Sequence, residues 1–380
     1  ADERVELRRL DVYPSEFGVD RQRNALAEFV LKGDARRKDV LFDRAPPSFD
    51  EDGDGVGEPG TYVPSNDAQD RAVRRALAAE DFALVHGPPG TGKTHAIARL
   101  VRALVDRGDR VLLSAYTNRA VDNAVEALVA QGFDDVVRMG TESGVGESVE
   151  RFRLPRRGDP AALADRLRSA PVVAATTSTA GSRTMRELDF DVAVVDEASQ
   201  LTEPAALAAI NRADCFVLVG DHRQLPPVVR AENALSRSLF ERLIDAHPDA
   251  SVALDRQYRM AQAVQAFPSR EFYGGALRPA TPEVAAQRID EIADPGALPP
   301  ELRSPVSFVH VDGDDGAHSD AREAERVAEL VEALEAAGVP REDVGVIAPF
   351  RAQVAEIGRR VPGGVTVDTV DRFQGSSREV

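Results

Sequence analysis

Short apolar runs alternate with longer amphipathic stretches along most of the chain from residue 66 onward. Apolar runs of this length are typical of strands that are buried on both faces of a parallel sheet. The stretches between them, such as 96–105 and 121–129, place apolar residues at the spacing of a helix. Strands that alternate with helices indicate βαβ units. We predict seven strands here: Phe82–His86, Val111–Ala115, Val136–Met139, Val172–Ala175, Val192–Val195, Phe216–Val219 and Val252–Leu254.

A second alternation follows nearer the C-terminus. It contains one helix whose apolar residues recur at i, i+3, i+4 and i+7, and three short apolar runs that we interpret as strands. The chain ends soon afterwards, so we expect this second sheet to be incomplete. The helical positions are Val327, Leu330, Val331 and Leu334, and the predicted strands are Val306–Val311, Val344–Ala348 and Val365–Val367.

The region before this pattern, residues 1–65, is the least regular. It contains one helix-like stretch, Arg21–Leu31, and an acidic, glycine-rich linker at 50–60. We predict three regions: an accessory or stalk region with its linker (1–65), a first α/β domain (66–262) and a second one (263–380). The fold class is therefore α/β, with parallel sheets covered by helices.

The charge of the chain is strongly and unevenly negative. Asp and Glu number 64 against 47 Lys and Arg, which gives a net charge of −17. Only Lys32, Lys38 and Lys93 are lysines. An acidic surface poor in lysine indicates adaptation to high salt, as in a halophilic archaeon, and a GC-rich genome that favours arginine is the alternative. By itself the negative charge argues against a nucleic-acid partner.

The composition also excludes several classes of protein. No apolar run approaches the roughly 18–20 residues of a membrane-spanning helix, so no membrane partner is expected. No secretory signal is evident at Ala1, and the missing initiator Met suggests that upstream sequence has been left off. The single cysteine, Cys215, excludes an internal disulfide and a multi-cysteine metal site within these residues. A cytoplasmic location is the resulting expectation.

A phosphate-binding loop follows the first predicted strand and opens a helix. Its glycines allow backbone N–H groups to surround phosphates at a helix N-terminus. Lys93 is expected to reach the β- and γ-phosphates of ATP, and the Thr94 hydroxyl to ligate Mg²⁺. The loop consists of Gly87, Pro88, Pro89, Gly90, Thr91, Gly92, Lys93 and Thr94.

Two further polar sites follow later predicted strands. Asp196 and Glu197 end the strand Val192–Val195, which we expect to lie beside the strand before the loop. Asp196 is then a candidate ligand of Mg²⁺, and Glu197 a candidate base that deprotonates the attacking water. Gln224 follows the next strand and could sense the γ-phosphate, because its amide both donates and accepts.

These elements, in this order, resemble superfamily 1 helicases. The segments that carry the resemblance run from Asn66 to the end and include Asp196-Glu197-Ala198-Ser199-Gln200 and Gln257-Tyr258-Arg259-Met260. Subfamily B, the group of the nonsense-mediated-decay RNA helicase and the Okazaki-fragment nuclease–helicase, is the more similar one. The resemblance implies tandem RecA-like P-loop domains, ATP and Mg²⁺ as cofactors, and movement 5′→3′ along a single strand.

The resemblance also implies roles for single residues around ATP. Gln69 corresponds to the glutamine that reads the adenine edge, and Tyr258 to the residue that stacks on the adenine. Arg259 corresponds to an arginine that reaches the γ-phosphate. Gln374 and Gly375 would lie near the nucleotide. Without the resemblance, the residues alone favour a core position for Tyr258 and a surface charge for Arg259.

The same resemblance identifies candidate contacts to the nucleic-acid strand. Hydroxyl, amide and backbone N–H groups of four motifs would hold its sugar-phosphate backbone, and such groups need no net positive charge. These candidates are Thr117, Asn118, Asn123, Thr176, Thr177, Pro349, Phe350 and Thr369.

Two departures from the family pattern bear on activity. Ser376-Ser377 stands where relatives often carry Arg-Glu, so the ribose contact usually assigned there is in doubt. Motif VI, which supplies a second arginine to ATP, is absent before Val380, so we expect a fragment with weak ATP hydrolysis of its own.

We predict an ATP-dependent DNA helicase of replication or repair, with a possible upstream nuclease domain in the intact protein. An RNA helicase of the same superfamily and a nucleotide-gated strand-binding module are the alternatives.

Overall fold

The chain folds into two compact units. The computed structural model describes residues 16–50, 65–155, 157–229, 233–313 and 318–380. The first unit comprises Ala1–Gly87 and Lys93–Ala253, and the second comprises Pro88–Gly92 and Leu254–Val380. The five residues Pro88–Gly92 of the phosphate-binding loop thus group with the second unit. This division falls between Ala253 and Leu254. The domain limits that we expect from the sequence, 66–262 and 263–380, stay a prediction.

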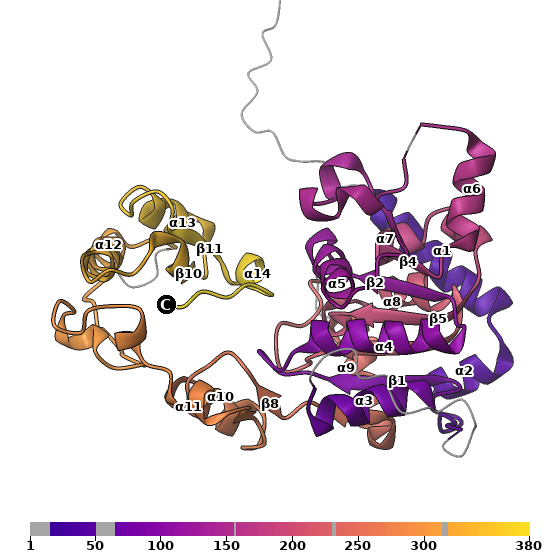
Figure 1. The fold of residues 1–380 in the computed structure, drawn as a ribbon, viewed down its shortest axis with the longest axis horizontal. Helices are drawn as coiled ribbons and strands as arrows, with labels where there is room; N and C mark the ends of the chain where they lie inside the picture. The colour runs from indigo at the N-terminus through magenta and orange to yellow at the C-terminus, as the bar shows by residue number, and fades with distance from the viewer. Residues whose placement is uncertain (1–15, 51–64, 156, 230–232, 314–317) are drawn as a thin grey trace, which may run out of the picture. The chain divides into compact units, whose positions relative to one another are not determined.

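A seven-stranded sheet forms the centre of the first unit (Figure 1). Its order is β3-β4-β2-β5-β6-β1-β7, and every neighbouring pair is parallel. All seven predicted strands are confirmed, with differences only at their ends, and so is the α/β fold class. The strands are β1 (Phe82–His86), β2 (Val111–Ala115), β3 (Val136–Met139), β4 (Val172–Thr176), β5 (Phe190–Asp196), β6 (Ala213–Gly220) and β7 (Ser251–Ala253).

Two groups of helices pack on this sheet. The first group, α3, α4 and α5, packs side by side, and in the second group α1 and α7 both contact α8. Side chains cap several N-termini; Asn66, for example, accepts a hydrogen bond from the N–H of Gln69 at the start of α3. The helices are α1 (Glu16–Lys32), α2 (Ala35–Leu41), α3 (Asp67–Leu77), α4 (Lys93–Arg107), α5 (Asn118–Ala130), α6 (Pro160–Ser169), α7 (Thr177–Ala180), α8 (Glu203–Ile210) and α9 (Leu239–Ala246).

The core of this unit explains why the apolar runs could be identified from the sequence. Every residue of β2 and of β4 is buried, as expected for parallel strands that have helices on both faces. Phe82 of β1 stacks on Phe216 of β6, with ring centroids 5.2 Å apart. Since the strand interiors are buried, the strand ends become the natural positions for polar groups.

The second unit contains less regular structure. β8 (Arg256–Gln257) pairs with β9 (Arg278–Pro279), and β10 (Gly345–Ala348) pairs with β11 (Thr366–Thr369), both in parallel. The predicted helix is confirmed as α12, and it buries Val331 and Leu334. The helices of this unit are α10 (Gln262–Phe272), α11 (Pro282–Ala286), α12 (Ala321–Ala336), α13 (Arg351–Gly358) and α14 (Val370–Phe373).

One predicted strand of the second unit is wrong. Residues 306–311 form no strand, and Phe308 is 92% exposed. An alternating apolar pattern becomes a strand only beside a partner with free backbone groups. Of the two other predicted strands of this sheet, β10 pairs with β11, and no described segment pairs with 306–311.

Two further predictions concern the N-terminal region with its acidic linker and the absence of a membrane-spanning helix. Most of the predicted acidic linker, from residue 51 on, lies outside the described residues, as does all of the chain before α1. Within the described part, no helix combines the length and the apolarity that crossing a bilayer requires.

Candidate nucleotide and nucleic-acid sites

The phosphate-binding loop connects β1 to α4. The N–H of Gly87 donates to the carbonyl of Gly220 at the end of β6, over 2.9 Å. Within the loop, Gly90 and Gly92 have φ of 75° and 76°, values that side chains disfavour. The Lys93 ammonium donates to the Gly87 carbonyl over 2.8 Å, and therefore folds back over the loop. A lysine and a helix N-terminus in this arrangement can bind phosphate groups.

Asp196 ends β5 and is the buried carboxylate of the site, with 5% of its surface exposed. Our expectation that β5 lies beside β1 is wrong, because β6 lies between them. Burial, together with the neighbouring carboxylate of Glu197, raises the pKa of Asp196 to about 7, against the opposing effect of Lys93. A divalent cation bound here would favour the ionised form of Asp196.

Glu197 has a backbone conformation that is unusual for its type. Its φ of 52° lies in the left-handed region, and it is one of two such non-glycine residues in the described chain. The conformation turns the chain directly after the strand, and one Glu197 carboxylate oxygen accepts a hydrogen bond from Gln200 over 3.1 Å. Strain of this kind costs on the order of 1–3 kcal/mol and is concentrated at functional sites. Glu197 is therefore held in one orientation at the end of the sheet.

Gln224 belongs to a hydrogen-bonded group after β6. Its amide nitrogen donates to Asp221 over 2.7 Å, and the other oxygen of Asp221 lies 2.9 Å from the ring nitrogen of His86. Asp221 is fully buried. The ring of His222 packs against His86 at 4.7 Å, and burial lowers the pKa of His222 to about 4, with His86 and Arg223 acting in the same direction. The bond to Asp221 uses one of the two N–H groups of the Gln224 amide and leaves its oxygen available to a ligand.

The segment Gln257–Met260 contacts the phosphate-binding loop. The Tyr258 N–H donates to the Gly90 carbonyl over 2.8 Å. A β-carbon on Gly90 would come within 2.8 Å of the Arg259 β-carbon, so only glycine is accommodated there. The buried Gln257 side chain accepts from the N–H groups of Arg259 and Met260 and donates to the Met260 carbonyl. Tyr258 and Arg259 are exposed, while the backbone that carries them is fixed.

The other predicted nucleotide contacts lie in separate places. Gln69 is buried at the start of α3, with 2% exposure. Gln374 follows α14, and its amide nitrogen is buried with no hydrogen-bond partner among the described residues. Gly375 is exposed, with a φ of 76°. The unpartnered donor of Gln374 can serve a ligand acceptor, and its role near a nucleotide remains a prediction.

Predicted strand contacts of the first unit follow β2 and β4, which are adjacent in the sheet. Thr117 and Thr176 cap the helices α5 and α7 through their hydroxyl oxygens. Thr177 is buried and Asn123 is exposed. Asn118 has its carbonyl oxygen occupied, because it accepts from the fully buried guanidinium of Arg138 over 3.0 Å. These residues thus lie at one edge of one sheet, the carboxyl edge.

The predicted strand contacts of the second unit lie after β10 and at the end of β11. Pro349 and Phe350 directly follow β10, and Phe350 is 46% exposed and packs on His318 at 4.5 Å. Thr369 ends β11, and its N–H donates to Asp368. β10 and β11 are neighbouring parallel strands, so these side chains share one sheet edge.

The residues of the first unit are suited to a nucleotide with a divalent cation. Backbone N–H groups at the start of α4 and Lys93 suit phosphates, and Thr94 and Asp196 provide the oxygen ligands that Mg²⁺ prefers. The described residues contain no cluster of three or more His, Cys, Asp or Glu side chains that would hold a metal without substrate. Because Mg²⁺ usually keeps several waters and binds substrate phosphates, a cation at Thr94 and Asp196 would complete its coordination with water and phosphate oxygens.

The sequence did not indicate the supporting residues of this site. Asp221, Gln257 and Arg138 are buried, and each holds a predicted residue in place through a hydrogen bond. Asp221 and Gln257 stand beside residues that the motifs identify, and this position in the motifs was the available signal. Arg138, in contrast, lies within an apolar strand, and no pattern distinguished it from a surface arginine.

Comparison with protein families gives two matches along the chain. Both family profiles are described as AAA domain, one matching residues 64–163 and 157–232 and the other 235–380. Together they cover both alternating patterns of strands and helices.

Several relatives of the chain carry helicase names. The "DNA replication ATP-dependent helicase/nuclease JHS1" of Arabidopsis thaliana is 34% identical over 97% of this chain and 29% of that protein. The mouse protein "DNA replication ATP-dependent helicase/nuclease DNA2" is 34% identical over 83% of this chain and 33% of its own length. The "Uncharacterized ATP-dependent helicase MJ0104" of Methanocaldococcus jannaschii is 28% identical over 98% and 70%. The chain thus spans about a third or less of the two helicase/nucleases.

Solved structures give weaker matches. An Arterivirus nonstructural protein 10 helicase in complex with DNA is 21% identical over 56% of this chain and 44% of that chain, with a TM-score of 0.38. The PRRSV helicase is 16% identical over 81% and 46%, also with a TM-score of 0.38. These scores are too low to assign a function.

Proposed function

Since residues 64–232 and 235–380 match AAA domains and the chain is related along most of its length to ATP-dependent helicases, we propose that it is the motor of a superfamily 1B helicase. It hydrolyses ATP and moves along single-stranded nucleic acid, with DNA favoured over RNA. The proposed direction is 5′→3′, and the proposed process is DNA replication or repair.

One observation carries this proposal. Lys93, Asp196, Glu197 and Gln224 all follow strands of a single parallel sheet, at its carboxyl edge. The Asp196 carboxyl group has its pKa raised to about 7 by burial and by Glu197. Paired carboxylates next to a phosphate-binding lysine are suited to phosphoryl transfer to water.

The roles within this site follow from the groups that each residue offers. Thr94 and Asp196 would hold Mg²⁺, which supplies charge neutralisation on the phosphate oxygens when bound. Glu197 orients the attacking water and takes its proton. Gln224, whose amide nitrogen is bound to Asp221, offers its carbonyl oxygen to the same water. These are general-base and positioning roles.

The second unit and α3 supply the remaining nucleotide contacts of the proposal. Tyr258 stacks on the adenine and Gln69 reads its edge, while Arg259 stabilises charge on the γ-phosphate. Gln374 and Gly375 approach the nucleotide. The Tyr258–Gly90 hydrogen bond supports this assignment, because it fixes the Tyr258 backbone beside the loop.

The nucleic-acid contacts are proposed at the two sheet edges described above. Hydroxyl and amide groups after β2 and β4 would hold the backbone, together with Phe350 and Thr369 of the second unit. Unequal hold on the strand by the two units, switched by ATP, would then produce movement. We also propose that the acidic surface is an adaptation to concentrated salt.

Two alternatives remain with the proposal. Backbone contacts discriminate poorly between DNA and RNA, so an RNA helicase would have a similar site. A nucleotide-gated strand-binding module would bind ATP and a strand without unwinding. The strained, oriented Glu197 favours turnover, because a binding module needs no base at that position.

Stimulated ATP hydrolysis tests the proposal directly. Hydrolysis is measured with no nucleic acid, with a single-stranded DNA and with an RNA of the same sequence, for the wild type and for Lys93→Ala. We expect stimulation by DNA and a loss of about 100-fold or more in Lys93→Ala, since this lysine contacts the transferred phosphate. Lys32→Ala, which changes an exposed lysine, is the matched control.

The outcomes separate the alternatives. Greater stimulation by RNA would replace DNA by RNA as the proposed substrate. ATP binding without hydrolysis at any strand concentration would favour the nucleotide-gated module.

A further inference from the structure

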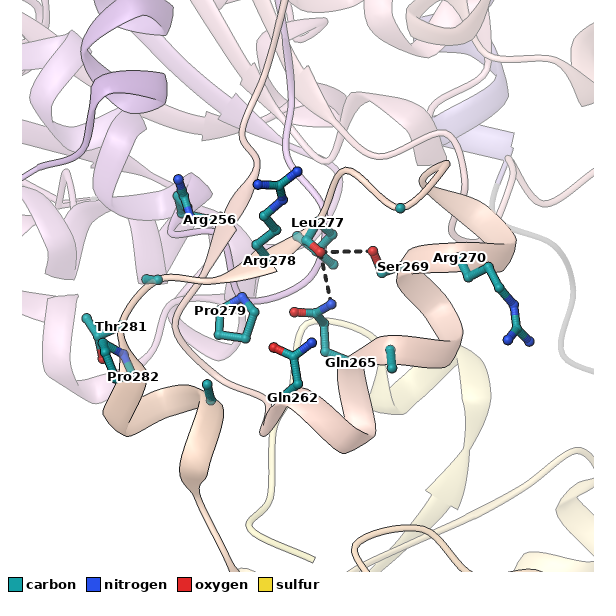
Figure 2. A pocket seen from close by; sticks show the side chains of 14 residues that line it. Arg256, Gln262, Gln265, Ser269, Arg270, Leu277, Arg278, Pro279, Thr281 and Pro282 are labelled. Carbon is teal, nitrogen blue, oxygen red and sulfur yellow. Dashed lines mark hydrogen bonds between the residues drawn. The ribbon is translucent and has the colours of Figure 1, made fainter.

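A basic hollow lies in the second unit, between α10, β9 and α11. Its volume is about 610 Å³, and Figure 2 shows the side chains that line it. None of these residues is acidic or aromatic. The polar lining residues are Arg256, Gln262, Gln265, Ser269, Arg270, Arg278 and Thr281. The chain has a net charge of −17, so a hollow lined only by basic and neutral groups is a candidate site for an anion.

The three arginines of the hollow differ in their ionic partners. Arg270 pairs with Glu271 over 2.7 Å and points away from the other labelled side chains in Figure 2. Among the residues that the structure describes, no carboxylate pairs with Arg256 or Arg278, although both are exposed. Uncompensated guanidinium groups are suited to phosphate, whose oxygens accept two parallel hydrogen bonds from each.

The floor of the hollow presents a buried acceptor. Gln265 is 3% exposed, and its amide nitrogen donates to the Leu277 carbonyl over 2.9 Å. This bond fixes the orientation of the amide, and its oxygen has no hydrogen-bond partner among the described residues. A buried acceptor without a donor costs free energy. The ligand that completes this site must therefore bring an N–H or O–H group.

A nucleotide has both groups that the hollow requires, a phosphate and a hydrogen-bond donor. Its phosphate matches Arg256 and Arg278, and a base N–H or a sugar hydroxyl can donate to the Gln265 oxygen. The lining offers no ring on which a base could stack, so the contacts that it provides are those to phosphate and to one donor group. Arginine and amide contacts to phosphate and sugar are typical of groups that position a nucleic-acid strand.

We propose that this hollow binds one nucleotide of the nucleic-acid strand, with the phosphate at Arg256 and Arg278 and a base or sugar donor at Gln265. This inference rests on the proposed strand-binding function and adds a contact outside the helicase motifs. It also introduces a salt-dependent component into strand binding, because two guanidinium groups that engage a phosphate displace its counterions.

The test measures binding of a fluorescent 12-nucleotide DNA to the 380-residue chain over a range of salt concentrations. The double variant Arg256→Gln/Arg278→Gln should weaken binding about tenfold at low salt and reduce the salt slope by about 0.7 for the one phosphate lost. The matched control is Arg288→Gln/Arg359→Gln, which removes two exposed, ion-paired guanidinium groups of the same unit. It should leave the slope unchanged.

A second variant tests the acceptor. Gln265→Met keeps the volume of the side chain, and the Leu277 carbonyl still accepts from Ser269. It should weaken binding of normal DNA about threefold to fivefold. A strand with abasic sites throughout should bind wild type and Gln265→Met equally, provided that the donor is on the base. If wild type and Gln265→Met bind normal DNA equally but the variant binds RNA more weakly, the donor is the sugar hydroxyl.

The outcomes distinguish this inference from the proposed function. Strand binding that is unchanged in both pocket variants overturns the hollow as a site and leaves the helicase proposal intact. No strand binding by the wild type overturns the proposed function and this inference with it. Full competition by millimolar deoxycytidine monophosphate would make the ligand a free nucleotide and would overturn the strand assignment.

Discussion

The two units of this chain differ in how they hold their functional groups. In the first, seven parallel strands have buried interiors, and polar groups project from strand ends. In the second, two separate two-stranded sheets support the exposed residues Tyr258 and Phe350, and large apolar side chains such as Phe308 remain open to solvent. The bond-breaking groups of the proposed site, Lys93, Asp196, Glu197 and Gln224, all belong to the first unit.

We infer from this difference that the two units have different roles, with the chemistry in the first and reversible contacts in the second. Chemistry on a phosphate requires groups fixed to within a fraction of an ångström, which a densely packed sheet provides. Groups that bind and release a substrate in each cycle tolerate a softer support, because they change contacts repeatedly. We therefore expect the first unit to be sensitive to small chemical changes and the second to be tolerant of them.

The largest expected effect is at Glu197. Glu197→Gln keeps the shape of the side chain and removes the base, so turnover should fall by about 10²–10³ while ATP binding persists. Single-turnover hydrolysis and binding of a fluorescent ATP analogue measure the two separately. Glu187→Gln, an exposed change in the same unit, is the control. An equal loss in both variants would contradict the assigned role.

A matched pair of core substitutions tests the packing difference. Leu112 lies in β2 at 0% exposure, and Leu334 lies in α12 at 4% exposure among partly buried neighbours. Leu112→Ala should cost about 4 kcal/mol and Leu334→Ala about 2 kcal/mol, because a softer site closes more of the cavity. Hydrogen exchange resolved by peptide reports on each unit. An equal loss of unfolding free energy in the two variants would show that the two units do not differ in packing.

The smallest expected effect is a pH dependence at His222. Burial lowers the pKa of His222 to about 4 from its ordinary 6.5, so the unfolded chain binds a proton first as the pH falls. The stability that His222 contributes is present above pH 6.5 and is lost between about 6.5 and 4. Allowing for solvent screening, we expect roughly 1–2 kcal/mol.

Urea unfolding at several pH values measures this contribution as the difference between wild type and His222→Gln. His310→Gln changes an exposed histidine and should follow the wild type. If the free energy of unfolding of His222→Gln depends on pH in the same way as that of the wild type, the pH dependence belongs to other groups.

The contrast between the units also explains which features the sequence could predict. The strands β1, β2 and β3 were predicted to their last residue, because burial leaves each with a mostly apolar run, which Arg138 interrupts in β3. Segment 306–311 carries a similar local pattern, yet its state depends on a partner strand elsewhere. The place of β6 between β1 and β5 is likewise a property of the sheet, and no local pattern contains it.

The candidate site divides in the same way. Residues that touch phosphate could be predicted, because glycines, a lysine and carboxylates directly after apolar strands form a pattern typical of phosphate sites. The residues that orient them, such as Asp221 and Gln257, act through contacts between segments distant in the chain or through a local turn. The basic hollow was not predicted, since Arg256 and Arg278 are two of 44 arginines and only the fold brings them together.

Buried Arg138 has a consequence for how the proposed strand contact reads sequence. Its guanidinium donates to the side-chain carbonyl oxygen of Asn118 and so fixes the amide, whose N–H groups can donate to a strand. Phosphate oxygens accept from N–H groups whatever base they carry. A contact that these N–H groups make to phosphate carries no sequence information, which suits a motor that advances equally over every sequence.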